Sequence, residues 1–153
     1  MRSDWRAVWV VFAAGLAAGA CMSKVPPALP ALRVDLSLAI VQSGFVHTVM
    51  YAVGALAGAF GGAAADRFGQ KRFALIGLAF MAAGGLAGAA APGYVVLLFS
   101  RFVEGIGFIL LTVSAAPLLV SATLPKDRPA AFSLWSCYMA TGGNLILLFE
   151  PLA

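Results

Sequence analysis

Long apolar stretches alternate along the chain with short polar stretches that contain most of the charged residues. An apolar stretch of about 20 residues is long enough for a helix to cross a hydrocarbon core about 30 Å thick. The pattern therefore predicts an all-α, polytopic transmembrane helix bundle of about five spans. The predicted spans are residues 5–23, 38–65, 73–91, 94–124 and 130–149.

The polar stretches between these spans contain residues that end helices. Residues 24–30 include three prolines, and we expect no helix to continue through them. Ser37 is the expected N-cap of the second span. The fourth span is too long for a perpendicular crossing, so we expect it to tilt, to kink near Pro117 or to protrude into water.

Composition excludes two other classes of protein. Only 10% of the residues are charged and 62% are apolar, whereas a soluble domain carries about 25% charged residues. A water-soluble enzyme of this length is therefore excluded. A transmembrane barrel is excluded because its strands alternate apolar and polar residues over about ten positions, and the apolar stretches here are unbroken for longer.

The basic residues predict the orientation of the bundle, because Lys and Arg are retained on the cytoplasmic side. Lys24 and Arg33 fall on one face, and all other basic residues outside the spans fall on the opposite face: Arg2, Arg6, Arg67, Lys71, Arg72, Lys126 and Arg128. The N-terminus is therefore predicted to be cytoplasmic, in a bacterial inner membrane. A lipoprotein-type signal sequence ending at Cys21 is the alternative for the first span.

Glycines inside the predicted spans recur four residues apart. In lipid, helices associate through close contact between faces of small residues. The pattern therefore predicts tight helix packing, with a continuous face on the second span; the alternative is a composition that is merely rich in glycine. The glycines concerned are Gly15 and Gly19, then Gly54, Gly58 and Gly62, then Gly84 and Gly88.

The loop after the second span carries a dense motif, GAAADRFGQKR at residues 62–72. It resembles the G-x-x-x-D-R-x-G-x-K/R-K/R signature of the major facilitator superfamily of secondary transporters. Residues 29–36, the R-x-x-x-G pattern of residues 101–105 and the basic residues 126–128 resemble further elements of that family. The resemblance implies that residues 1–153 are the N-terminal transmembrane portion of such a fold, without its sixth span and C-terminal half.

The same resemblance implies a gate in this loop, formed by Gly62, Asp66, Arg67, Gly69, Lys71 and Arg72. A carboxylate beside several cations and a turn-forming glycine can pair in one conformation and separate in another. In the family this loop is understood to latch the outward-open state. The alternative is a solvated loop whose cations only fix the orientation.

Two ionisable residues lie inside the fourth span, where an unpaired charge costs several kcal/mol. Arg101 and Glu104 are three residues apart and share a helix face. They either neutralise each other as an intrahelical pair, or act in substrate binding and proton coupling. Tyr138 and Asn144 on the fifth span are further candidates for that role, or they bond to neighbouring helices.

These features predict a transporter that moves a small polar or anionic solute by alternating access, with or without a coupled proton. The fifth span lacks the G-x-x-x-G-P-x-x-G-G signature typical of drug antiporters in the family. The expected partners are the lipid bilayer, the solute and a second transporter half or another helix bundle, and no nucleic acid. A small membrane protein acting as an interaction or assembly subunit is the alternative. We expect no enzyme activity, cofactor or metal, because no catalytic motif occurs.

Overall fold

The computed structural model describes residues 2–149, apart from the side chains of residues 57–64, 66–68, 147 and 149. Within this part the chain forms helices and no strand, so the predicted all-α class is confirmed. The helices are α1 (Trp5–Ser23), α2 (Val25–Asp35), α3 (Ile40–Phe68), α4 (Gln70–Ala89), α5 (Tyr94–Ala122), α6 (Arg128–Ser136) and α7 (Tyr138–Phe149).

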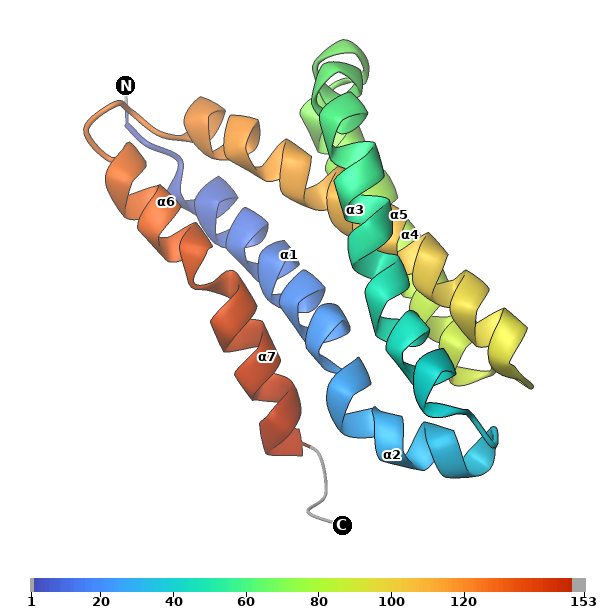
Figure 1. The fold of residues 1–153 in the computed structure, drawn as a ribbon. Helices are drawn as coiled ribbons and strands as arrows, with labels where there is room; N and C mark the ends of the chain where they lie inside the picture. Colours follow the sequence, from blue (N-terminus) through green and yellow to red (C-terminus); the bar gives the residue numbers. More distant parts are fainter. Residues whose placement is uncertain (1, 150–153) are drawn as a thin grey trace.

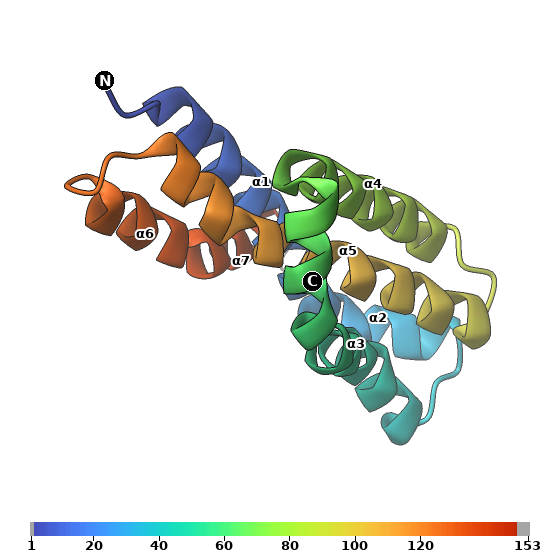
Figure 2. The ribbon, with the colours of Figure 1, turned by 90° about the horizontal axis from the view of Figure 1, so that it is seen from above.

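The helices form two groups that α5 connects (Figures 1 and 2). In one group α5 packs along α4 and α3, and in the other α1 packs along α7. The far end of α5 reaches α1 and α6. Buried apolar residues from α1, α4 and α5 meet in the middle, with Ala18, Met81 and Leu111 among them. The core of this protein therefore follows α5.

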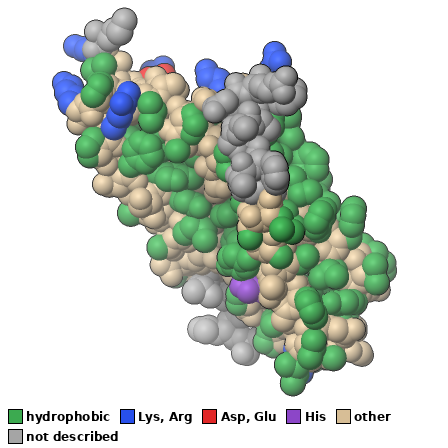
Figure 3. Space-filling view, turned by 45° about the horizontal axis from the view of Figure 1, so that its top comes forward, with side chains coloured by type: hydrophobic (Ala, Val, Ile, Leu, Met, Phe, Trp, Pro, Cys, Tyr) green, Lys and Arg blue, Asp and Glu red, His purple; other side chains and the backbone are tan. Residues whose placement is uncertain are grey.

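Three helical stretches in the described part are long and apolar enough to cross a membrane: Trp5–Asp35, Gln70–Ala89 and Tyr94–Ala122. Ile40–Leu56 is a shorter apolar stretch of the same kind. Many large apolar side chains are exposed, and Figure 3 shows them spread over the flank of the molecule. Leu56, for example, is 76% exposed and Leu148 is 79% exposed. Such a surface suits contact with lipid.

The N-terminus and two of the connections between helices lie at one end of the molecule. The N-terminus, the turn between α3 and α4 and the link between α5 and α6 lie together at the top of Figure 1. The Ser3 hydroxyl donates to Asp127 at 2.6 Å and accepts from the Leu124 N–H at 2.9 Å, which ties the N-terminus to the α5–α6 link. The basic residues that predict orientation therefore share one end, as expected, and the side of the membrane stays a prediction.

Helix α1 ends at Ser23, as expected, but the expectation that no helix continues through the prolines of residues 24–30 is wrong. Helix α2 begins at Val25, directly after the C-cap of α1 at Lys24, whose backbone is itself helical. Pro26 and Pro27 stand in the first turn of α2, where a helix does not need their N–H groups. Pro30 lies inside α2, at the position where its missing N–H would otherwise bond to Pro26. The prolines therefore separate two consecutive helices and leave the chain helical.

The start of the second predicted span also differs from expectation. Ser37 is not its N-cap, because its φ of +49° places it in the tight turn before the helix. Ala39 is the N-cap, and its N–H donates to the Gln42 side chain at 2.9 Å. Gln42 thus supplies the capping bond from inside the helix.

The fourth predicted span forms one helix, whereas the fifth forms two. Helix α5 continues through Pro117 as one element of 29 residues. The fifth is divided at Cys137 into α6 and α7. The Ser136 hydroxyl donates to the Phe132 carbonyl and the Cys137 thiol to the Ser133 carbonyl. At the break the Cys137 N–H donates to the Leu134 carbonyl, three residues back, at 3.2 Å, which tightens the last turn of α6.

Candidate functional site

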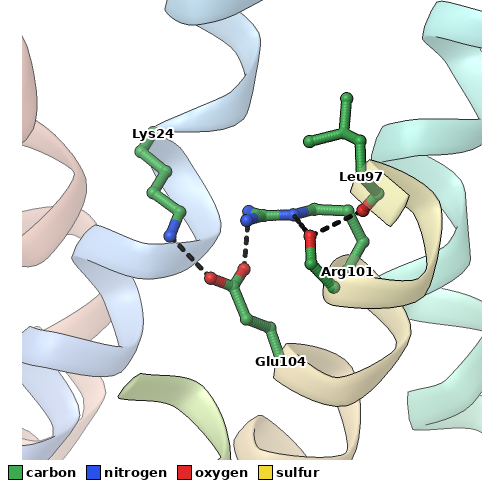
Figure 4. A network of polar contacts seen from close by, with 5 residues as sticks. Lys24, Leu97, Arg101 and Glu104 are labelled. Atoms are coloured by element: carbon green, nitrogen blue, oxygen red, sulfur yellow. Dashed lines mark hydrogen bonds and ion pairs between the residues drawn. The ribbon is translucent and has the colours of Figure 1, made fainter. Parts of the chain in front are cut away.

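A cluster of three charged side chains, two of them buried, lies where α1, α4 and α5 meet (Figure 4). The Arg101 guanidinium and the Glu104 carboxylate, one turn apart on α5, approach to 2.5 Å. The Lys24 ammonium reaches the other oxygen of Glu104 at 2.6 Å from the junction of α1 and α2. Glu104 therefore bridges two cations from different parts of the fold, and we call these three residues the charge cluster.

The junction between α1 and α2 explains how Lys24 can enter this cluster. Lys24 is the C-cap of α1, which ends at Ser23, and Pro26 and Pro27 follow after Val25. A proline has no N–H, so the carbonyls of Met22 and Ser23 lack their usual helical donors. The two helical hydrogen bonds that would span Lys24 are therefore missing, and the chain changes direction between α1 and α2 (Figure 1).

Neighbouring polar groups hold Arg101 in place. Ser100 is 1% exposed, and its hydroxyl accepts a hydrogen bond from the Arg101 Nε at 3.4 Å. The same hydroxyl donates to the Leu97 carbonyl at 2.6 Å. The guanidinium is therefore bonded on one side by a carboxylate and on the other by a hydroxyl that is itself fixed.

Helix α4 accommodates the cluster through three glycines. A Cβ at Gly85 would lie 3.1 Å from the Glu104 Oε1 and 3.3 Å from the Lys24 Nζ. At Gly84 it would lie 2.7 Å from the Glu104 Cγ, and at Gly88 it would overlap the Arg101 guanidinium. The glycines of α4 thus leave the space that the charged side chains occupy.

The cluster carries one excess positive charge, because two cations face a single carboxylate. Glu104 is 0% exposed and Arg101 4% exposed, while the Lys24 side chain retains 30% exposure. Counted along α5, Glu104 lies roughly 15 Å from the start at Tyr94 and within about 6 Å of the helix midpoint. An excess charge at this depth in lipid is costly unless it faces water or an anion.

A pocket of about 210 Å³ adjoins the cluster, and both Lys24 and Arg101 line it. Its remaining walls come from α2, α3, α4 and α5 and are apolar or glycine, with Val25, Val46 and Leu97 among them. The two cations of the cluster are thus presented to one small, otherwise apolar space.

The residues predicted for substrate or proton coupling are divided between separate places. Asn144 lines a second pocket of about 500 Å³ between α1, α3 and α7, together with His47 and Tyr51. Tyr138 lies elsewhere, stacked on Trp135 with ring centroids 4.3 Å apart. Arg101 and Glu104 are brought together, whereas Tyr138 and Asn144 are not part of their cluster.

The predicted gating loop is only partly described. Gly69 alone separates α3 from α4, with a φ of +89° that favours glycine. Lys71 and Arg72 follow on the first turn of α4 and are exposed. Gly62 and the side chains of Asp66 and Arg67 lie outside the described residues, so their expected pairing stays a prediction.

The remaining packing glycines lie on α1, where they face α6 and α7, and on α3, where Gly54 faces α5. On α1, a Cβ at Gly15 would lie 2.6 Å from the Trp135 ring, and one at Gly19 would lie 2.8 Å from the Tyr138 carbonyl. A Cβ at Gly54 on α3 would lie 3.2 Å from Ile109 on α5. Gly58, like Gly62, lies outside the residues whose side chains are described.

Lys24 is the member of the cluster that sequence patterns did not single out. It stands 80 residues from Glu104 in the chain, and its charge was counted only as a marker of orientation. The position of Lys24 could have indicated this role. It stands between an apolar run and a Pro-Pro pair, and a cation there sits at a helix junction.

Replacing Gly88 with alanine is expected to displace Arg101 while leaving the fold intact. The new methyl group would meet the ends of the Arg101 and Ser100 side chains, which can rotate away. We expect any activity of the full-length protein that needs the Arg101 position to fall by about tenfold, which corresponds to about 1.4 kcal/mol, with a nearly unchanged melting temperature. Gly93→Ala is the matched control, because a Cβ there meets nothing within 4 Å. Equal activity of the two variants would contradict the prediction.

Comparison with known proteins gives consistent matches. A family model described as Major Facilitator Superfamily matches residues 8–152. The Methylenomycin A resistance protein of Bacillus subtilis is 37% identical over 87 residues, which are 56% of this chain and 18% of that protein. The Puromycin resistance protein pur8 of Streptomyces alboniger is 30% identical over 146 residues, 94% of this chain and 29% of that protein.

The Multidrug resistance protein MdtH of Klebsiella pneumoniae is a further relative, 40% identical over 77 residues. That match covers 50% of this chain and 19% of the relative. The chain thus spans less than a third of the length of each of these proteins.

Proposed function

Because the chain belongs to the Major Facilitator Superfamily, we propose that it forms part of a secondary transporter for a small polar or anionic solute. The transporter works by alternating access, in which one half of the protein rocks against another around a central site. The similarity to a Methylenomycin A resistance protein and a Puromycin resistance protein supports a role in moving a compound across the membrane. The proposal includes a bacterial inner membrane and a cytoplasmic N-terminus.

The excess positive charge of the charge cluster is the observation that supports a polar or anionic solute. A buried ion pair that only stabilised the fold would be complete with one cation for one carboxylate, but here Lys24 and Arg101 share Glu104. A group at this depth with an unbalanced charge is a functional site by default. A solute that brings a negative charge or strong hydrogen-bond acceptors would balance it.

Alternating access draws support from the connections within the cluster. Lys24 belongs to the α1–α2 junction and Glu104 to α5, so their contact joins two different segments of the fold and would form or break if these segments moved. A coupled proton, where one is used, would be carried by Glu104, the carboxylate inside the cluster. The gating loop at residues 62–72 would close the cytoplasmic side.

Drug export is the second candidate function, and the names of the relatives favour it. They are a Methylenomycin A resistance protein, a Puromycin resistance protein and Multidrug resistance proteins. The missing drug-antiporter signature in the fifth predicted span argues in the other direction. The pocket of about 500 Å³ that includes His47 and Asn144 would be the site for a larger compound.

The full-length protein in sealed proteoliposomes provides the test. Solutes from three groups, small anions, neutral polar compounds and cationic drugs, are applied in concentration jumps while uptake is measured. We expect uptake of a small anion or polar solute, and Asp66→Asn should lower its rate by about tenfold or more at equal protein content. Asp35→Asn, at the opposite end of the molecule, is the matched control and should transport normally.

The outcomes separate the parts of this proposal. Uptake of cationic drugs alone would replace the anion proposal with drug export. Absence of transport for every solute would favour the assembly-subunit alternative. Normal uptake by Asp66→Asn would contradict the gate while leaving transport in place.

A further inference from the structure

The pocket of about 210 Å³ beside the charge cluster has an unusual combination of walls. Two cations, Lys24 and Arg101, stand at one side. Val25 and Leu32 of α2, Val46 of α3 and Leu97 of α5 form an apolar lining around the rest. A ligand that suits this space must therefore offer a charged end and a hydrocarbon end.

The charge of the ligand follows from the cluster. Lys24 has three N–H donors and Arg101 has five, and Glu104 accepts one contact from each. Donors are therefore left over on both cations, while only one positive charge is unbalanced. A ligand with one negative charge neutralises the cluster, whereas a dianion would leave a net negative charge in an apolar space.

The size of the ligand follows from the pocket volume. A water-sized group takes about 30 Å³ in the liquid, so the space holds roughly seven non-hydrogen atoms. The Lys24 side chain retains 30% exposure, so the charged side of the pocket is not sealed from its surroundings. Glycines 85 and 88 form the wall beside the charges and keep that side open.

The geometry points to a binding site for a short aliphatic monocarboxylate in this pocket. The carboxylate accepts hydrogen bonds from the Lys24 Nζ and the Arg101 guanidinium, and the chain of about three to five carbons packs on Val25, Val46 and Leu97. Glu104 keeps both cations in position and does not itself contact the ligand. This inference rests on the proposed function, for which it names the solute class.

Binding to the purified full-length protein is measured by isothermal titration with butyrate. Butyramide has the same shape without the charge, nitrate has the charge without the hydrocarbon, and succinate has a second charge. We expect butyrate to bind at least about tenfold more tightly than each of these three compounds. Lys24→Gln should weaken butyrate binding by about tenfold or more, because it removes the unbalanced charge.

Two further variants test the geometry of the pocket. Arg33→Gln is the matched control, since Arg33 is exposed on the same helix, α2, and does not line the pocket. It should bind butyrate as the wild type does. Ala28→Leu places a larger side chain in the wall of the pocket and should abolish binding. Thermal melting without ligand verifies that each variant is folded.

The results distinguish this site from the proposed function. Butyrate binding that depends on Lys24, combined with no transport of any solute in proteoliposomes, would support the site and overturn the transport proposal. Transport of another solute, with butyrate and butyramide bound equally, would overturn the site and keep transport. Nitrate binding as tight as butyrate would overturn the hydrocarbon part of the assignment.

Discussion

Glu104→Gln is expected to be the most damaging single substitution in the described part of the chain. Removing the carboxylate leaves Lys24 and Arg101 facing each other without a counter-charge, and Arg101 is only 4% exposed. Breaking a buried ion pair by removing one partner costs about 3–5 kcal/mol. We expect little folded protein in the membrane, a clearly lower melting temperature of the remainder and no transport.

A second substitution tests whether the unpaired charges are the cause. In Lys24→Met/Glu104→Gln one of the two stranded cations is gone, so part of the lost stability should return while transport stays absent. The readout is the fraction of monodisperse protein after heating, measured across a temperature series. Asp35→Asn serves as the control, since that carboxylate is exposed. A melting temperature of Glu104→Gln equal to that of wild type would contradict the bridging role.

The outline of the fold could be predicted because it depends on local patterns. The first apolar stretch becomes α1 with the expected limits of Trp5 and Ser23, and the fourth starts at Tyr94 as expected. The prediction that no helix runs through the prolines of residues 24–30 is wrong. The number of prolines does not reveal whether they fall in the first turn of a new helix. The break at Cys137 is a local change in backbone hydrogen bonding, which apolarity does not record.

The charge cluster could be predicted only in part. The spacing of three residues places Arg101 and Glu104 on one face wherever their helix lies, and the structure joins them. The contact with Lys24 depends on how α1 and α5 pack, and no local pattern encodes a contact across 80 residues. The cluster therefore changes from a neutral pair to a bridge with an excess positive charge, which the pair alone did not indicate.

The spacing of the glycines also predicts only part of their role. A spacing of four residues identifies a helix face of small residues, but it does not identify what that face contacts. Gly88 faces the Arg101 and Ser100 side chains, whereas Gly84 faces both the Glu104 side chain and the α5 backbone at Ser100 and Glu104, so both glycines adjoin the charge cluster. Gly77 lies seven residues before Gly84 on the same face of α4, outside any four-residue pair, and it makes the closest backbone contact with α5.

Gly77→Ala and Gly107→Ala are therefore expected to destabilise the protein, although alanine favours a helix more than glycine does. A Cβ at Gly77 would lie 2.7 Å from the Gly107 carbonyl oxygen and 2.9 Å from the Leu111 nitrogen. At Gly107 it would lie 2.5 Å from the Gly77 carbonyl oxygen. These are backbone atoms, so α4 and α5 must move apart, and overpacking of this kind costs about 1–3 kcal/mol.

The same substitution at Gly44 supplies the matched control, because a Cβ there meets nothing within 4 Å. Gly44→Ala should gain up to about 1 kcal/mol from helix propensity, so its change in stability is expected to be opposite in sign to those of Gly77→Ala and Gly107→Ala. Melting temperatures of the full-length variants in one detergent give the comparison. If all three variants shifted upward together, glycine here would reflect composition alone. Opposite signs would instead show that α4 and α5 meet through their backbones, which is the contact that holds the glycine wall of the charge cluster in place.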